Sequence, residues 1–177
     1  MPNPPTKQDL LSLLGLARYF RNWIPSFGIL AKPLYEAIKR PLQEPLLPGK
    51  SVERPFQELK EAFTNASPLA LPDFNKPFIL YTGEKQSIAL GLLGQKSGPD
   101  LKIIVNLTKQ LDLTALGGPT YLRALAAAAV LTLKAQKLSY SQPITVYSPH
   151  AISDLISNQA EKFLHPTQLQ QTFLILL

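Results

Sequence analysis

The chain has 177 residues but no cysteine, one methionine, one tryptophan and no long apolar run. Without cysteine it has no disulfides and no thiolate metal sites, a composition typical of an intracellular protein. Its apolar runs are far shorter than the roughly 18 residues that a membrane-spanning helix needs. The first residues, MPNPPTKQD, lack the apolar centre of a signal peptide. We therefore expect neither a membrane protein nor a secreted one.

Motifs of several enzyme classes are also missing. Gly91 and Gly94 lie within a strand pattern and do not form a phosphate-binding loop. Ser148 has no Gly-x-Ser-x-Gly surroundings, so it is expected to cap a helix and not to act as a nucleophile. His150 and His165 lie far apart, with no supporting pattern of ligands. We predict no metal site and no cofactor.

The composition is that of a chain with a core of its own. Hydrophobic residues make up 45% and charged residues 17% of the sequence. The 17 prolines cluster at segment junctions and predict several short elements. The net charge of +6 suits an anionic partner such as nucleic acid. However, residues 1–66 and 67–177 each hold nine basic and six acidic side chains, so a mildly basic surface is an equal alternative.

Residues 1–66 predict a small unit of three helices. Thr6 and Asp9 resemble a capping box, and the first helix is expected to run from there to Pro25. Gly28 to Ile38 predicts a second helix, the proline-rich residues 39–50 a loop, and Val52 to Thr64 a third helix. The predicted buried faces are Leu10, Leu13, Leu14, Ala17, Phe20 and Ile24 in the first helix, Ile29, Leu30, Leu34 and Ile38 in the second, and Phe56, Leu59 and Phe63 in the third.

Residues 67–76 predict a proline-marked connector, and residues 77–177 a second domain. Pro77 to Gln95 predicts two strands with a turn at Gly83, and the two later glycines predict a bulge or a close backbone approach. Leu101 to Leu107 predicts a third strand, and Ile144 to Tyr147 a fourth. A long helix is expected from about Thr120, facing the sheet with Leu122, Leu125, Ala126, Ala129, Leu133 and Gln136, and a last helix is expected to reach Ile156.

The expected order is therefore βββαβα, an RNase H-like α/β fold with a mixed sheet. In the first strand, Phe78, Leu80 and Thr82 share one face, while Ile79 and Tyr81 share the other. Apolar bulk on both faces indicates a central strand. The final segment, residues 163–177, is weakly periodic, and we expect the domain to be truncated there.

Several blocks of the sequence occur in an order and at spacings that are specific when taken together. The blocks are LGLARYFRNWIPSF (Leu14 to Phe27), KPLYEAI (Lys32 to Ile38), FQELKEAF (Phe56 to Phe63), SPLALPDFNKPFIL (Ser67 to Leu80), LLGQK (Leu92 to Lys96), KQLD (Lys109 to Asp112) and QPITVYSPHAISDLI (Gln142 to Ile156). They resemble the reverse transcriptase part of retroviral and gypsy-type Pol polyproteins, and most closely gammaretrovirus-like sequences. One departure is the loop from Gln43 to Lys50, where the family typically has a tryptophan.

The resemblance implies a thumb followed by an RNase H-like connection domain. The parent enzymes carry out RNA-directed DNA synthesis with Mg²⁺, using a YxDD motif that this sequence does not contain. In the parent arrangement the fingers and palm would precede Met1 and the active RNase H domain would follow Leu177. The chain would then be a non-catalytic segment between two enzymes.

An alternative is that the second domain is itself an RNase H, as in gypsy-type elements. Two-metal hydrolysis requires several carboxylates that converge on paired Mg²⁺ ions. Such enzymes place these acids at the end of the first strand, on the following helix and at the end of the fourth strand. The positions fall near Gly83, Arg123 and Pro149, none of them acidic. The nearest acid, Glu84, is expected to be an exposed turn residue, so no catalytic residue is predicted.

The resemblance also implies contact with an RNA/DNA hybrid or duplex, mostly through phosphates. Tyr19 and Trp23 are candidates to stack on a sugar or base, with a core position as the alternative for Trp23. For each cation the alternative is a solvated surface charge. The candidate phosphate-binding residues are Arg18, Arg21, Lys32, Lys39 and Arg40 in the helical unit, and Lys85, Lys96, Lys102 and Lys109 in the sheet domain.

Two functions of different classes remain open at this stage. The first is a non-catalytic reverse transcriptase remnant that binds nucleic acid. The second is a retrovirus-derived scaffold or interaction protein that binds a protein partner, for example reverse transcriptase itself. A reading frame without a selected role is a third possibility.

Overall fold

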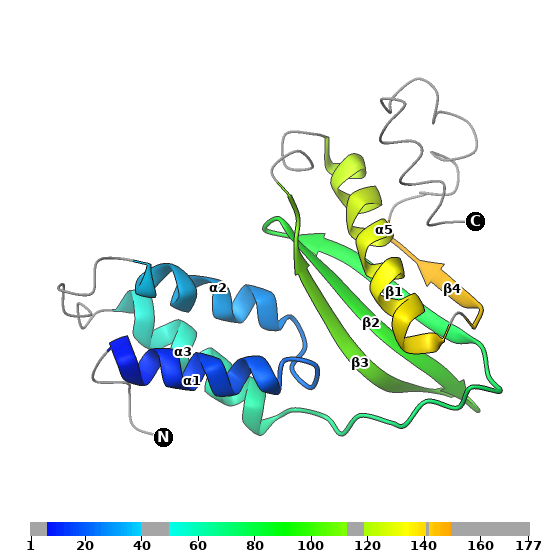
Figure 1. The fold of residues 1–177 in the computed structure, drawn as a ribbon, viewed down its shortest axis with the longest axis horizontal. Coiled ribbons are helices and arrows are strands. Elements are labelled where there is room, and N and C mark those ends of the chain that lie inside the picture. Colours follow the sequence, from blue (N-terminus) through cyan, green and yellow to red (C-terminus); the bar gives the residue numbers. More distant parts are fainter. Residues whose placement is uncertain (1–6, 40–49, 113–118, 141, 150–177) are drawn as a thin grey trace. The chain divides into compact units, whose positions relative to one another are not determined.

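The computed structural model describes residues 7–39, 50–112, 119–140 and 142–149. The chain forms two compact units, Met1–Pro68 and Leu69–Leu177, called here the helical unit and the sheet unit. Figure 1 shows the helices of the first unit and the sheet with its covering helix in the second.

The helical unit contains α1 (Lys7–Tyr19), α2 (Phe27–Ile38) and α3 (Lys50–Thr64). Each helix contributes one apolar side to a shared core, so the amphipathic pattern of the sequence becomes packing. Several half-buried residues lie at the margin of this core, among them Leu13, Leu30, Ile38 and Phe63. The fully buried members are Leu10, Leu14, Ala17, Ile24, Phe27, Ala31, Leu34, Phe56 and Leu59.

The predicted end of the first helix at Pro25 is wrong. α1 ends at Tyr19, and residues 20–26 form turns in which Ser26 has a left-handed backbone (φ 55°). The turns carry Ile24 and Phe27 back into the core, where they are 0% and 5% exposed. Ile24 therefore reaches the core from a folded-back segment and not from another helical turn. Phe20, also predicted to be buried, is 36% exposed.

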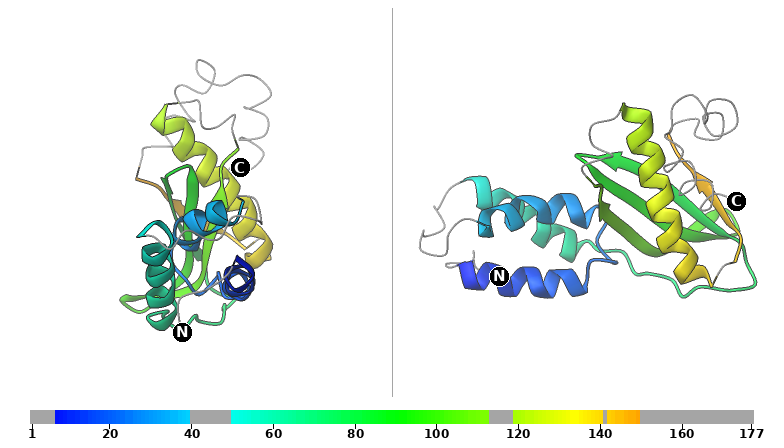
Figure 2. Two further views of the ribbon diagram at one scale, coloured as in Figure 1. Left: turned by 90° about the vertical axis from the view of Figure 1, so that its left-hand side faces the viewer. Right: turned by 45° about the horizontal axis from the view of Figure 1, so that its top comes forward.

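The sheet unit confirms the predicted mixed sheet. Its strands are β1 (Phe78–Lys85), β2 (Ile88–Ser97), β3 (Asp100–Gln110) and β4 (Ile144–Tyr147), in the spatial order β3-β2-β1-β4. β1 is central, antiparallel to β2 and parallel to β4, which follows the crossover helix α5 (Thr120–Ser139). Both views in Figure 2 show α5 on one face of the sheet. The helix expected to reach Ile156 and the segment 163–177 lie outside the described residues.

The predicted sheet-facing side of α5 is partly wrong. Leu125 and Ala129 are buried, but Leu133 is 42% exposed and Gln136 is also exposed. The side chains that meet the core of the sheet include Ala127, Leu131 and Ala135, all 0% exposed. Alanine lets the helix backbone approach the strands closely, so the small residues and not the largest apolar ones define this face.

The predicted turn at Gly83 is also wrong, because β1 continues to Lys85 and Gly83 pairs with Leu90. The turn is made by Gln86 and Ser87, whose φ angles are 52° and 67°. Two successive left-handed residues are typical of a type I′ hairpin turn, which follows the twist of the strands. The Glu84 side chain stabilises it by accepting a hydrogen bond of 2.7 Å from the Ser87 backbone N–H.

The bulge predicted at the β2 glycines is confirmed at Gly94. The β2/β3 register shifts between Leu93 and Gly94. A Cβ on Gly94 would lie 2.7 Å from the backbone oxygen of Lys102, and one on Gly91 would lie 3.2 Å from Leu131 Cδ1. Both glycines therefore allow a close approach, the first of a strand and the second of α5.

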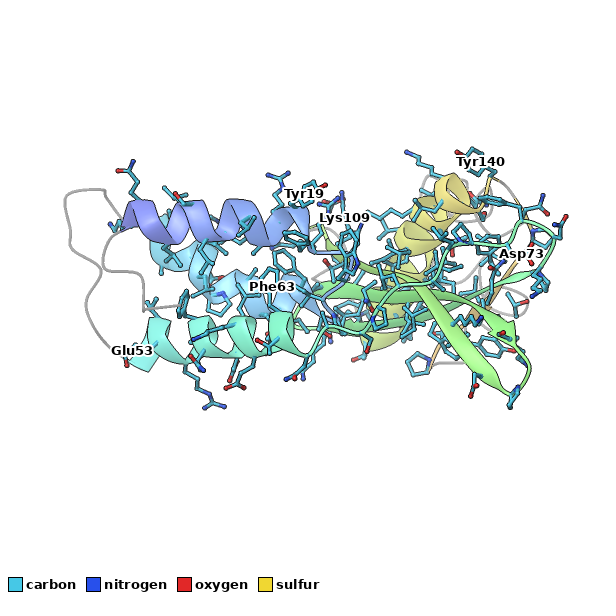
Figure 3. The ribbon with its side chains drawn as sticks, turned by 90° about the horizontal axis from the view of Figure 1, so that it is seen from below. Tyr19, Glu53, Phe63, Asp73, Lys109 and Tyr140 are labelled. Atoms are coloured by element: carbon cyan, nitrogen blue, oxygen red, sulfur yellow. The ribbon has the colours of Figure 1, made fainter. Side chains whose placement is uncertain are left out.

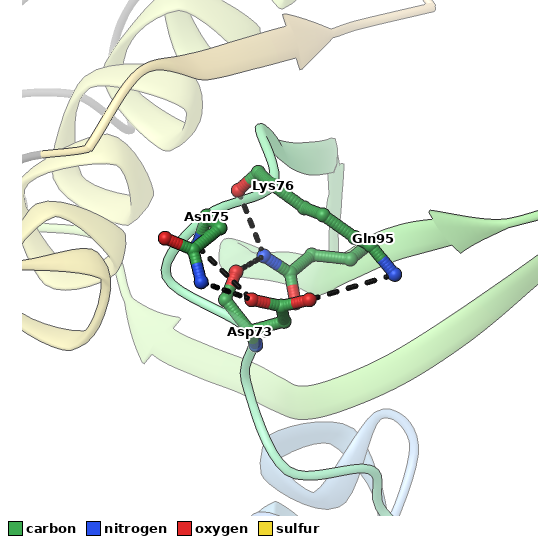
Figure 4. A network of polar contacts seen from close by, with 4 residues as sticks. All are labelled: Asp73, Asn75, Lys76 and Gln95. Atoms are coloured by element: carbon green, nitrogen blue, oxygen red, sulfur yellow. Dashed lines mark hydrogen bonds and ion pairs between the residues drawn. The ribbon is translucent and has the colours of Figure 1, made fainter.

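Gln95 joins the connector to the sheet (Figure 4). This side chain, 5% exposed, accepts a hydrogen bond from the Asp73 N–H (2.9 Å) and donates to the backbone oxygens of Asp73 (2.7 Å) and Lys76 (2.9 Å). The Asp73 carboxylate accepts the Asn75 N–H at 3.0 Å. That hydrogen bond, helped by the charge of Lys76, lowers the pKa of Asp73 below its usual value. The connector is thus an ordered part of the sheet unit.

Candidate nucleic-acid interface

Aromatic rings gather where α1 ends, and two of the predicted cations adjoin them. The rings of Phe20 and Trp23 meet edge to face, with centroids 5.7 Å apart, and Phe20 also contacts Tyr19 and Phe63. Figure 3 shows Tyr19 and Phe63 at the same end of the helical unit. Tyr19 is 74% exposed and is accessible to a ligand. Trp23 is 39% exposed, so the alternative of a core position for its side chain is wrong, although much of the ring is covered. Arg18 and Arg21 are exposed in the same segment.

Two predicted cations, Lys32 within α2 and Lys39 directly after its last residue, lie along one side of that helix. Lys32 and Lys39 are seven residues apart, which is about two turns, and they project in similar directions. Lys39 is exposed, whereas Lys32 is half-buried. Arg40 lies outside the described residues. Within the described part of this unit, the predicted cations therefore form two short groups.

The four predicted cations of the sheet unit are all exposed but do not share one face. Lys109 pairs with Ala89, a member of the core under α5, so it lies on the helix-covered face at the edge strand. Lys102 pairs with Gln95 and lies on that same face. Lys85 and Lys96 alternate onto the opposite face. The predicted exposure of these four lysines is thus confirmed. Which face of the sheet each lysine occupies depends on which face α5 covers.

The expected nuclease positions lie toward the end of β1 and just beyond β4. The parallel pairing of β1 with β4 ends at Tyr81 and Tyr147, two residues before Gly83 and Pro149 respectively. Arg123 of α5 reaches the same end of β1, since its guanidinium lies beside Glu84. These side chains do not fit a pair of Mg²⁺ ions, because Gly83 offers no ligand and Arg123 is cationic. No group of three or more His, Cys, Asp or Glu that could hold a metal occurs among the described residues.

Glu84 is not the exposed turn residue that the sequence predicted. It belongs to β1, its side chain is 11% exposed, and its Oε2 lies 3.4 Å from Arg123 Nε. Its other oxygen accepts the Ser87 N–H described above. Arg123 Nε is buried and makes no hydrogen bond within the described part of the chain, so the contact is an ion pair. The acid nearest to the nuclease position is therefore already neutralised by the protein itself.

We expect Arg123→Ala to destabilise the sheet unit by about 1–3 kcal/mol, because it leaves a mostly buried carboxylate without its counter-charge. Urea unfolding followed by circular dichroism measures this loss. The control is Arg54→Ala, which breaks the Arg54–Glu58 pair on α3, whose side chains are 83% and 44% exposed. That change is expected to cost no more than about 0.5 kcal/mol. Equal losses in the two variants would contradict the structural role assigned to Arg123.

Two contacts on β1 could not be predicted from the sequence. One is the Glu84–Arg123 pair, and the other is a stack of Tyr81 on Tyr147 with ring centroids 5.1 Å apart. Strand alternation did predict that Tyr81 lies on the face of the sheet opposite Phe78. The partners Tyr147 and Arg123 come from distant segments, and local sequence does not predict how these segments align with β1.

Comparisons with known proteins agree with this architecture. No protein-family model matches the sequence. The Gag-Pol polyprotein of avian reticuloendotheliosis virus is 41% identical over 177 residues, which is 100% of this chain and 15% of that protein. The Pol polyprotein of feline endogenous virus ECE1 is 38% identical over 169 residues, covering 96% of this chain and 16% of that protein. The chain thus spans only a small part of the relatives it matches.

Solved structures show the same fold. A foamy viral protease-reverse transcriptase in complex with dsDNA aligns with a TM-score of 0.81 and 25% identity, over 100% of this chain and 37% of that chain. The same kind of protein in complex with an RNA/DNA hybrid aligns with a TM-score of 0.79 and 24% identity, over 99% of this chain and 24% of that one.

The fold is that of a reverse transcriptase thumb followed by a connection-type domain. The chain is related to the reverse transcriptase region of retroviral Pol polyproteins, as the sequence blocks had indicated. Among the described helices, none has the length and apolar character needed to span a lipid bilayer.

Proposed function

We propose that this chain is a non-catalytic thumb and connection segment derived from a retroviral reverse transcriptase, and that it binds the primer-template duplex through phosphates. The observation that carries the proposal is the Glu84–Arg123 pair at the end of β1. At the place where a nuclease of this fold needs free acids, the carboxylate is held by a cation and by a backbone N–H. An acid so engaged is a poor ligand for Mg²⁺.

Three observations support duplex binding. The sequence has a net charge of +6. Arg18, Arg21 and the sheet lysines are exposed and thus able to reach phosphates. The structures with this fold include foamy viral proteins in complex with dsDNA and with an RNA/DNA hybrid. Phosphate contacts need only exposed cations at suitable spacing, so binding is expected to show little sequence selectivity.

Binding of a labelled RNA/DNA hybrid, measured by fluorescence anisotropy at several salt concentrations, tests the proposal. If about four phosphates are neutralised, affinity should fall by about 100-fold between 50 and 200 mM salt. Arg18→Ala and Arg21→Ala should each lower affinity and reduce the slope of log affinity against log salt by about one.

Arg54→Ala is the matched control for lost charge, because Arg54 is an exposed cation of the same unit that is already paired with Glu58. We expect its salt slope to equal that of the unaltered protein. Affinity that does not change with salt, or an absence of hybrid binding at low salt, would contradict the proposal. The second outcome would favour the scaffold function, in which the chain binds a protein and no nucleic acid.

A further inference from the structure

The face of the sheet opposite α5 is called here the open face. Phe78, Leu80 and Leu93 point toward α5. Neighbouring strand residues alternate to the other side, and paired residues share a side. The register therefore places one row of residues across all four strands on the open face, namely Tyr147, Tyr81, Leu92 and Asn106. Only the two tyrosines of this row are exposed, because Leu92 is half-buried and Asn106 is 6% exposed.

Two of these four residues form an aromatic platform. The rings of Tyr81 and Tyr147 are stacked, with an interplanar angle of 19°. They remain 43% and 47% exposed, so a large part of both side chains is accessible to a ligand. The Thr82 hydroxyl donates a hydrogen bond of 3.1 Å to the Tyr147 backbone oxygen and fixes β4 against β1. The platform is thus held by the strand pairing before any ligand binds.

The charges on the open face have one sign. Lys85 lies four residues from Tyr81 along β1, and Lys96 lies four residues from Leu92 along β2. Because β1 and β2 are antiparallel, the two lysines stand about 13 Å from the aromatic row on opposite sides. The acidic strand residues, Glu84 and Asp100, alternate onto the face that α5 covers. None of the described strands therefore places a carboxylate on the open face, where it would repel a bound anion.

We propose that the open face binds an unpaired nucleic acid strand, with a base stacked on the Tyr81–Tyr147 platform and phosphates held by Lys85 and Lys96. The proposal goes beyond duplex binding and rests on the proposed function only in taking nucleic acid as the partner. A single strand is the occupant that fits, because a flat ring can stack only on a base that is free of its neighbours. The lysines on both sides suit a backbone that crosses the aromatic row.

The test compares a labelled short oligo(dT) with a blunt RNA/DNA hybrid by fluorescence anisotropy. Tyr81→Ala and Tyr147→Ala should each weaken oligo(dT) binding by about tenfold and leave hybrid binding within about twofold. Tyr81→Phe keeps the ring and should bind oligo(dT) as the unaltered protein does. Tyr35→Ala, which removes a 37% exposed tyrosine from α2, is the matched control and should change neither affinity.

A second readout reports contact at the platform directly. Trp23 is the sole tryptophan, so the double variant Trp23→Phe, Tyr81→Trp carries one indole on the open face. Its fluorescence should be quenched by oligo(dT) and unchanged by the blunt hybrid. An oligo(dT) affinity that Tyr81→Ala leaves unchanged, or no oligo(dT) binding by a protein that binds the hybrid, would overturn the stacking proposal. Loss of hybrid binding alone would overturn the proposed function and leave stacking supported.

Discussion

Gly94→Ala is expected to lower the free energy of unfolding of the sheet unit by about 2–3 kcal/mol. The added Cβ would lie 2.7 Å from the backbone oxygen of Lys102, and the Leu101 side chain is 3.1 Å away. Because the nearest neighbour is backbone, relief requires the β2/β3 pair to separate at the bulge. Urea unfolding followed by far-ultraviolet circular dichroism measures the effect.

Gly83→Ala is the matched control for this experiment. Gly83 lies on the adjacent central strand, and a Cβ there would have no neighbour within 4 Å. We expect it to be neutral or slightly stabilising, because alanine restricts the unfolded chain more than glycine does. Similar losses of stability for the two variants would show that the close approach at Gly94 does not limit the fold.

Leu131→Ala is expected to cost about 2–5 kcal/mol, because it leaves a cavity between α5 and β2. Leu131 is 0% exposed, and its two Cδ atoms sit over Gly91. Leu133→Ala, two residues along the same helix, removes a side chain that is 42% exposed and should cost less than about 1 kcal/mol. The free energies of unfolding of both variants are measured by chemical denaturation. A larger loss for Leu131→Ala than for Leu133→Ala is the expected result, because the two leucines lie on different faces of α5.

Adding Gly91→Ala to Leu131→Ala should recover part of the lost stability. A Cβ at position 91 would point to the space that Leu131 vacates, whereas in the unaltered protein it would press on the Leu131 methyls at 3.2 and 3.3 Å. The two substitutions should therefore be non-additive by about 0.5–3 kcal/mol in a double-mutant cycle. Additive losses would contradict the packing of Leu131 on Gly91.

The sequence predicted the helices of the helical unit and the order of elements along the chain from β1 to β4, because apolar periodicity and turn residues are local signals. It could not predict which side of α5 meets the sheet. The Ala-rich helix has little hydrophobic contrast, so the fit of Leu131 over Gly91, and not hydrophobicity, decides the side. The turn prediction at Gly83 failed for a related reason. Glycine favours turns, but Gln86 and Ser87 take the left-handed positions with help from Glu84.

The candidate site was only partly visible in the sequence. The chain holds no acid at Gly83, Arg123 or Pro149, and that could be read directly. Two other contacts could not be read from the sequence, the ion pair of Arg123 with Glu84 and the stack of Tyr81 on Tyr147. Each joins β1 to a segment that lies far away in the sequence, beyond or within the crossover connection. Long-range register is set by the packing of the whole domain, so local patterns contain too little information to predict it.

The end of β1 carries the Glu84–Arg123 ion pair, with no acid at Gly83. Arg123 supplies the counter-charge of a mostly buried carboxylate, which is expected to stabilise this end of the sheet. The pair and the exposed cations support the proposed role in binding nucleic acid without cleaving it.

The most direct test is to incubate the purified chain with a labelled RNA/DNA hybrid at low salt, with and without Mg²⁺, and to measure binding and cleavage in the same samples. We expect the hybrid to be bound and to remain intact under both conditions. Cleavage that requires Mg²⁺ and is abolished by Glu84→Ala would show that the acid at the end of β1 is catalytic and would contradict the proposed non-catalytic role.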